Sequence, residues 1–187
     1  MNEPFFTFEE CFEKFLLNRS ARGLSDKTLK TYNSHFHSIS KYLPADTEID
    51  LLRNSDLEEM ISKMRKSNLS ANSINSYTRT LKTFLSWCNE EEITKVNIKL
   101  YKTEETIKDT YNDAELRRLL KKPNLKKCSY AEYRTWVMIN MLLNSGMRAS
   151  TLRNILIKDV DLERRIIVYR HNKNRSIQTC PLCFEIA

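Results

Sequence analysis

The chain has 187 residues and 41% hydrophobic content, which is enough to bury one ordinary core or two small ones and excludes a disordered tail. Only two glycines and four prolines interrupt it, so a mostly helical fold is favoured. The 31 Lys and Arg residues outnumber the 24 Asp and Glu residues and give a net charge of +7, which favours a polyanionic partner such as nucleic acid.

The cysteines and the N-terminus indicate the cellular location of the chain. Its five cysteines are odd in number and scattered, unlike the disulfide framework of a secreted protein, so we expect reduced thiols and a cytoplasmic location. No apolar run is long enough to span a bilayer, and the N-terminus has no basic region followed by an apolar one. We therefore expect neither a membrane segment nor export.

Two amphipathic helices are predicted at the start of the chain. A capping box at residues 7–10 opens the first helix, which we expect to end at Gly23 in a left-handed conformation. Ser25 opens the second helix, which should continue until Pro44 stops it. We interpret the aromatic residues of this region as core, because they recur at helical spacing.

Two more helices complete the first half. A capping box at residues 55–58 predicts the third helix, and Ser70 or Asn72 begins the longer fourth one. Because each apolar stripe needs another to cover it, residues 1–95 are predicted to form a four-helix bundle. Four basic residues lie away from the apolar stripes and are candidates for DNA backbone contacts, although for each one alone a solvated charge is the favoured interpretation: Lys27, Lys30, Arg79 and Lys82.

A charged segment without apolar periodicity, residues 96–110, is typical of a solvated linker, so a second unit is predicted at 111–187. Its first helix is capped by residues 112–115 and should be ended by Pro123. Lysines surround this proline and form the densest basic cluster of the chain. A solvated loop and a phosphate contact are both open interpretations for Lys121 and Lys122.

The next helix, about residues 130–144, is apolar nearly all round in its second half, which predicts burial at the centre of its unit. It should end at Gly146, and Arg148 follows where another short helix begins. A helix N-terminus carries partial positive charge, so a cation beside it is unfavourable unless an anion lies in front of the cation and the helix end. A phosphate would therefore suit Arg148. The alternative is an ion pair with Asp159.

The C-terminal part is predicted to form a β-hairpin. Apolar residues alternate in residues 164–170 and again after 176, so the hairpin covers 164–181 with Lys173 at its tip. The whole chain is therefore expected to be mainly α, with a helical bundle followed by a partial α+β domain that contains a small sheet.

The order and spacing of several motifs resemble the tyrosine recombinase, or phage integrase, family over nearly all of the chain. They are Gly23-Leu24-Ser25, Asn112-Asp113-Ala114-Glu115-Leu116, Leu142 to Ser150 with Asn-Ser-Gly-Met-Arg, Asp159-Val160-Asp161 and Cys180-Pro181-Leu182. The resemblance implies a SAM-like core-binding domain over 1–95 and the N-terminal portion of a catalytic domain over 111–187. It also implies double-stranded DNA as partner and breakage and rejoining of DNA through a phosphotyrosyl intermediate.

The same resemblance places Arg148 in the family's active site and Lys173 at the position of the lysine in its hairpin turn. A planar guanidinium can hold two oxygens of the charged phosphorane that forms during strand cleavage, and a flexible ammonium can help to protonate the leaving oxygen. Thr151 stands where the family usually has an acidic residue. An ordinary exposed turn lysine remains the alternative for Lys173.

The family's later active-site residues, a His-x-x-Arg pair, a later His or Trp and the tyrosine nucleophile, have no counterpart in these 187 residues. We therefore expect a DNA-binding protein of site-specific recombination that does not cleave DNA alone and that could form a homo-oligomer on DNA. The alternatives are a non-catalytic accessory or competitor factor, which includes the remnant of a decayed element, and a helical protein-interaction scaffold.

No metal, nucleotide or other cofactor is expected. Cys180 and Cys183 have the spacing of half a zinc site, but no second paired motif accompanies them. With two glycines the chain cannot build a phosphate-binding glycine loop, which argues against nucleotide hydrolysis.

Overall fold

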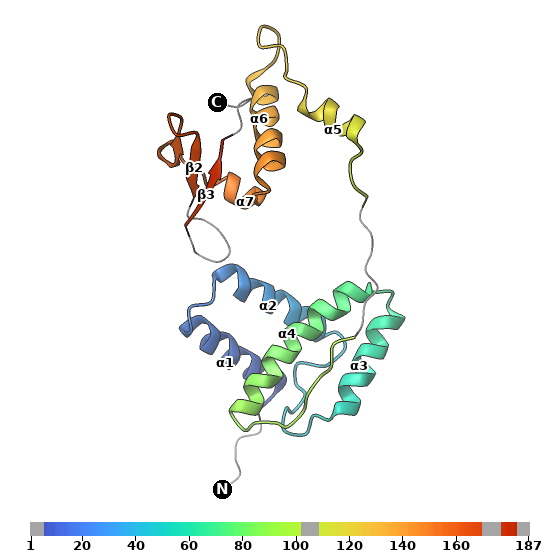
Figure 1. The fold of residues 1–187 in the computed structure, drawn as a ribbon. Helices are drawn as coiled ribbons and strands as arrows, with labels where there is room; N and C mark the ends of the chain where they lie inside the picture. The colour runs from blue at the N-terminus through green and yellow to red at the C-terminus, as the bar shows by residue number, and fades with distance from the viewer. Residues whose placement is uncertain (1–5, 102–108, 170–176, 183–187) are drawn as a thin grey trace. The chain divides into compact units, whose positions relative to one another are not determined.

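The computed structural model describes residues 6–101, 109–169 and 177–182. The chain divides into two compact units, Met1–Thr106 and Ile107–Ala187, which we treat separately (Figure 1). The first unit contains four helices, and the second contains three helices, a 3-10 turn and a small antiparallel sheet. The predicted mainly α architecture is confirmed.

The helices of unit 1 begin where local capping dictates. Thr7 and Glu10 form a complete capping box, and the hydroxyls of Ser25 and Ser70 accept from the backbone N–H three residues later. Gly23 has φ +77°, the left-handed conformation expected after the first helix. The bounds are α1 Phe8–Ala21, α2 Asp26–Ile39, α3 Asn54–Lys66 and α4 Ala71–Glu90.

Two predicted helix ends were wrong. The second helix ends at Ile39, before Pro44, because Leu43 is buried in the core through a turn rather than along the helix axis. The third helix begins at Asn54, not within 55–58. There the carboxylate of Asp56 reaches back to accept from the backbone N–H of Arg53 at 2.8 Å.

An aromatic cluster forms the core of unit 1. The ring of Phe12 is stacked on that of Phe36 with centroids 4.6 Å apart, and it contacts Phe84 at 5.2 Å. Phe8 and Phe15 join the same cluster, and all five rings are buried. This cluster unites α1, α2 and α4, so the aromatic residues predicted as core do pack there.

Part of the predicted solvated linker belongs to this core instead. Val96 and Ile98 are buried, and the Asn89 side chain donates to the carbonyl of Val96 at 3.1 Å. The buried Asn75 side chain donates to the carbonyl of Tyr101 at 2.8 Å and accepts from its N–H at 3.2 Å. Residues 96–101 are therefore an extended segment that is fixed to α4.

Replacing Asn75 with alanine should lower the free energy of unfolding of unit 1 by about 1–3 kcal/mol, because the backbone carbonyl and N–H of Tyr101 both lose their hydrogen-bond partner. Urea denaturation of the variant measures this change. Asn72→Ala is the matched control, since Asn72 is an exposed asparagine on the same helix and its loss should change little. Equal stability of the two variants would contradict the prediction.

Unit 2 begins with two capped helices. Asn112 and Glu115 form the predicted capping box, and Ser129 and Glu132 form another. The indole N–H of Trp136 donates to the carbonyl of Leu120 at 2.8 Å and joins the two helices. The bounds are α5 Asp113–Leu120, α6 Tyr130–Ser145 and α7 Ala149–Leu152.

The predicted burial of the second half of α6 was wrong. Trp136 and Asn140 are its buried residues, whereas Met138 is 37% and Leu143 is 48% exposed. Burial depends on neighbouring elements, and in the described part of unit 2 this helix packs against α5 and α7 without being enclosed. An apolar sequence alone therefore does not determine which faces of a helix are covered by neighbouring elements.

The sheet has three antiparallel strands in the order β1-β2-β3. The second and third strands pair as the hairpin expected from the alternating pattern, with Ile167 opposite Cys180. The first strand, which sequence reasoning missed, pairs Val160 with Ile167. The bounds are β1 Val160–Asp161, β2 Ile166–Tyr169 and β3 Gln178–Pro181, with a 3-10 turn, η1, at Ile157–Asp159 before them.

Candidate nucleic-acid interface

Arg148 is positioned by the turn between α6 and α7. Gly146 has φ +62° and its N–H donates to the carbonyl of Leu142 at 2.9 Å, which ends α6 in the left-handed conformation that glycine adopts most easily. The chain then becomes extended at Arg148, whose carbonyl accepts from the N–H of Thr151 at 2.8 Å. α7 has four residues, so the guanidinium rather than a helix dipole supplies the positive charge.

The ion pair considered between Arg148 and Asp159 is not present in the described residues. The carboxylate of Asp159 accepts from the backbone N–H of Leu156 at 2.9 Å and so caps the 3-10 turn. Arg148 is exposed. Its charge is therefore available to an external anion.

A pocket of about 220 Å³ lies at this turn and is lined by residues of the turn and of the sheet. Tyr169 and Gln178 contribute from a cross-strand pair of β2 and β3, and Thr151 contributes from α7. The lining residues are Ser145, Gly146, Met147, Arg148, Thr151, Tyr169 and Gln178. Sequence reasoning had not placed Tyr169 there, because the contact is made across the fold.

Lys173 lies outside the described residues. Its predicted role at the hairpin turn stays a prediction. The second cysteine of the possible zinc half-site, Cys183, also lies outside them. In the described ranges no cluster of His, Cys, Asp and Glu could hold a metal ion.

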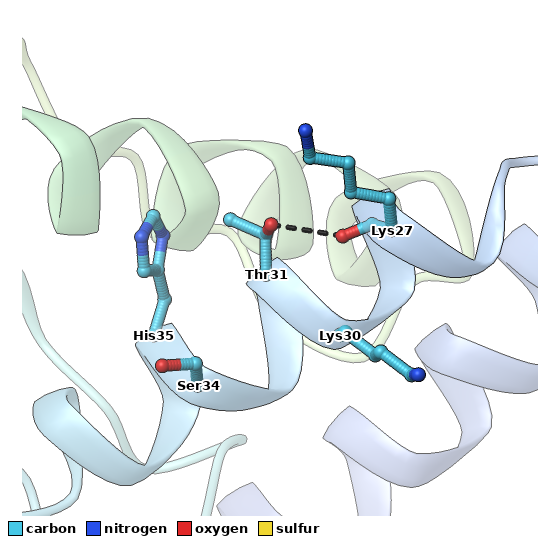
Figure 2. A pocket seen from close by; sticks show the side chains of 5 residues that line it. All are labelled: Lys27, Lys30, Thr31, Ser34 and His35. Atoms are coloured by element: carbon cyan, nitrogen blue, oxygen red, sulfur yellow. Dashed lines mark hydrogen bonds between the residues drawn. The ribbon is translucent and has the colours of Figure 1, made fainter. Parts of the chain in front are cut away.

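A second basic site lies on α2. Lys27 and Lys30 line a pocket of about 470 Å³ together with Thr31, Ser34 and His35 (Figure 2). None of these described lining residues carries a carboxylate. The Thr31 hydroxyl donates to the carbonyl of Lys27 at 2.9 Å. The structure therefore brings two of the predicted DNA-contacting residues together in one basic pocket.

The two candidates on α4 are exposed but do not share one face with this pocket. Thr80 faces α2, where His35 contacts it. At 3.6 residues per turn, Lys82 lies about 200° around the helix from Thr80, and Arg79 lies about 100° from it. Arg79 and Lys82 are therefore surface charges that do not line the α2 pocket.

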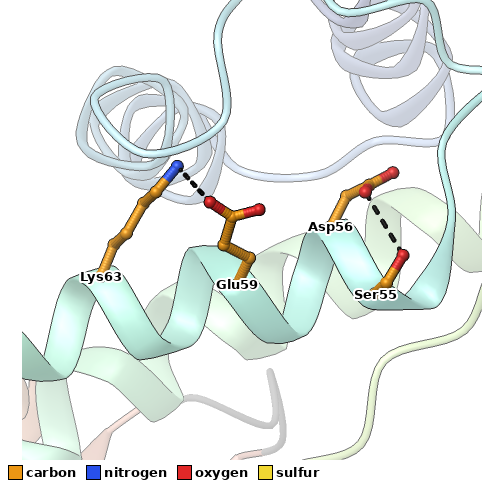
Figure 3. Close-up of polar contacts among 4 residues, drawn as sticks. All are labelled: Ser55, Asp56, Glu59 and Lys63. Atoms are coloured by element: carbon orange, nitrogen blue, oxygen red, sulfur yellow. Dashed lines mark hydrogen bonds and ion pairs between the residues drawn. The ribbon is translucent and has the colours of Figure 1, made fainter.

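The face of α3 differs in charge. Asp56 and Glu59 project from it, and Glu59 neutralises Lys63 with an N···O distance of 2.9 Å (Figure 3). Ser55 donates to Asp56. The carboxylates make this helix a poorer surface for a polyanion than α2.

In unit 2 the predicted lysine pair lies near Trp136. The ammonium of Lys122 lies 5.4 Å from the centroid of the Trp136 ring, a cation–π contact. Lys121 lines a pocket of about 410 Å³ between α5 and α6 with Arg118 and Trp136. Both lysines are exposed, and neither is among the described lining residues of the Arg148 pocket.

The chain thus consists of a helical bundle with one basic pocket, followed by an α+β unit with another. Residues 12–92 match the phage integrase N-terminal SAM-like domain, and residues 110–187 match the phage integrase family. Because these matches cover most of the chain, it belongs to the phage integrase family of tyrosine recombinases. In the described ranges no helix is both long and apolar enough to cross a membrane.

Curated relatives include the tyrosine recombinase XerD of Staphylococcus saprophyticus, 26% identical over 83% of this chain and 54% of the relative. Another is the tyrosine recombinase XerA of Pyrococcus furiosus, 26% identical over 92% of this chain and 56% of the relative. The chain therefore spans about half the length of the curated relatives that it matches.

Solved structures share the fold. The integrase of the Tn1549 transposon, in complex with circular intermediate DNA, superposes with a TM-score of 0.76 at 20% identity, over 97% of this chain and 62% of that one. A lambda integrase tetramer bound to a Holliday junction gives 0.74 at 16% identity, over 94% and 51%. At this identity the comparison establishes the fold alone.

Proposed function

We propose that the chain binds double-stranded DNA as part of a site-specific recombinase, through the α2 pocket of unit 1 and the Arg148 pocket of unit 2. The observation that carries this proposal is the exposed Arg148 guanidinium in a pocket without a carboxylate among its described lining residues. A planar, permanently charged group in such a pocket suits a phosphodiester, which it can hold through two oxygens.

The α2 pocket supports the same proposal from the other unit. Two lysines, two hydroxyls and an imidazole line it, a set of groups that can donate to phosphate oxygens. The family to which the chain belongs, and the solved neighbours that were determined on DNA, agree with this chemistry. Oligomerisation on DNA and the identity of the DNA site are further parts of the proposal.

Salt titration tests the DNA role. Anisotropy of a labelled duplex should show an affinity that falls steeply with salt, because each contacted phosphate releases counterions. Lys27→Ala and Lys30→Ala should each reduce the slope of log K against log salt by about 1. An affinity that is absent, or that does not depend on salt, would favour the helical scaffold instead.

Lys63→Ala is the matched control for these variants. It also removes one positive charge from unit 1, but Glu59 already neutralises that charge, so its slope should equal that of the unaltered chain. An equal decrease in all three variants would mean that net charge, rather than the α2 pocket, determines binding.

We further propose that the chain contributes binding rather than strand cleavage. The described lining of the Arg148 pocket holds one cation and no histidine, lysine or carboxylate that could exchange a proton with an attacking or leaving oxygen. This observation favours a non-catalytic DNA-binding role for residues 1–187, such as that of an accessory or competing factor.

A further inference from the structure

His35 occupies a defined place in the α2 pocket. Its Nδ1 lies 2.7 Å from the hydroxyl oxygen of Thr80 on α4, and its ring meets that of Tyr77 edge to face at 5.1 Å. Figure 2 shows the imidazole on the same side of α2 as Lys27 and Thr31. These contacts fix the ring while it still lines the pocket.

The direction of the bond between His35 and Thr80 follows from the surroundings of Thr80. Its side chain is 4% exposed, and its hydroxyl has no other hydrogen bond in the described residues. Two other threonines of α4 donate to the carbonyl four residues earlier, Thr78 to Ile74 and Thr83 to Arg79. If Thr80 accepted from His35, its own proton would be buried without an acceptor.

The Thr80 hydroxyl therefore donates and Nδ1 accepts. A neutral imidazole that accepts at Nδ1 carries its proton on Nε2. Burial lowers the pKa of His35 below its usual value, so the ring is neutral near pH 7. Of the other titratable groups around the ring, Lys27 and Lys30 line the same pocket and Tyr77 packs from α4.

Nε2 has no hydrogen-bond partner among the described residues, and Lys27 and Lys30 line the same pocket as His35. We propose that His35, held in its Nε2–H form by Thr80, donates a hydrogen bond to a DNA backbone phosphate in this pocket. This inference rests on the proposed DNA-binding function. It adds an uncharged donor whose effect can be separated from that of the lysines.

Two substitutions distinguish the role of Nδ1 as an acceptor from the role of Nε2 as a donor. His35→Asn retains a group that can accept from Thr80 and loses the Nε2 donor, whereas His35→Gln places an amide donor near the Nε2 position. At pH 7.5, His35→Asn should weaken duplex binding about tenfold, the effect of one hydrogen bond to a charged oxygen. The salt slope should stay unchanged, because no charge is lost.

His35→Gln should recover most of the affinity, and His37→Asn, an exposed histidine on the same helix, should bind like the unaltered chain. Thr80→Val removes the hydroxyl with little change of shape and frees the tautomer. Its affinity should be reduced at pH 7.5 and should recover as the pH falls through the pKa of His35, because the imidazolium carries a proton on Nε2 in any case. His35→Asn should show no such recovery.

A direct measurement does not depend on DNA. Nitrogen chemical shifts of ¹⁵N-labelled imidazole in the unaltered chain at pH 7.5 should show an unprotonated Nδ1 and a protonated Nε2 for His35. The opposite tautomer would overturn the proposal even if His35→Asn were too unstable to assay. Absence of DNA binding by the unaltered chain would instead overturn the proposed function, and with it the phosphate contact.

One further result would overturn the inference while leaving DNA binding intact. It is a His35→Asn variant that binds the duplex as tightly as His37→Asn does.

Discussion

An alanine at position 12 should remove a large share of the stability of the helical bundle. Phe12 is 1% exposed, and its ring contacts those of Phe36 and Phe84, so truncation leaves a cavity where three helices meet. Removing a buried phenylalanine costs about 3–5 kcal/mol. This is a large share of the roughly 5–15 kcal/mol by which most domains are stable.

Urea or thermal unfolding followed by circular dichroism measures the effect of Phe12→Ala. Leu17→Ala is the control on the same helix, because Leu17 is 71% exposed and its truncation should change the free energy of unfolding by less than about 0.5 kcal/mol. Similar midpoints for the two variants would mean that the aromatic cluster is not the core that stabilises unit 1.

The second large effect concerns cleavage. A chain of residues 1–187, incubated with a nicked suicide duplex bearing its own recombination site, should form no covalent protein–DNA adduct. The Arg148 pocket contains a tyrosine, Tyr169, but its described lining offers no base to activate that hydroxyl. Denaturing gels of labelled DNA measure the adduct directly.

Tyr169→Phe provides the corresponding control. Tyr169 lies on β2 opposite Gln178 and lines the same pocket as Arg148, so it is the tyrosine to exclude. Both proteins should leave the DNA free. An adduct that the unaltered chain forms and Tyr169→Phe does not would contradict the prediction and would identify Tyr169 as a nucleophile.

Local chemistry made much of the fold predictable. The caps at Thr7, Ser25, Ser70 and Asn112 were readable because the stabilising groups lie within three residues of each other. The start of α3 was not, because its cap uses the backbone N–H of Arg53 and the carboxylate of Asp56 rather than a serine side chain. The predicted end of the second helix failed because Pro44 lies beyond a turn that buries Leu43.

Contacts between distant residues were less predictable. The charges of residues 96–110 suggested a linker. In its first part, however, the buried residues Val96 and Ile98 alternate with exposed neighbours, which is the pattern of an extended packed segment. The signal was present, but the partner, Asn75, lies 26 residues from Tyr101. Likewise, the spacing of Lys27, Thr31 and His35 places them on one helix face, whereas the contact with Thr80 spans 45 residues.

The sequence by itself determined the class of fold, the position of Arg148 after the glycine that ends α6, and the membership of the family, because capping, periodicity and motif spacing are local properties of the chain. Tertiary structure alone decided that Tyr169 and Gln178 join Arg148, and that Thr80 orients His35. A pocket and a tautomer depend on contacts between residues that are far apart in the sequence, and no short stretch of residues determines the free energy of those contacts.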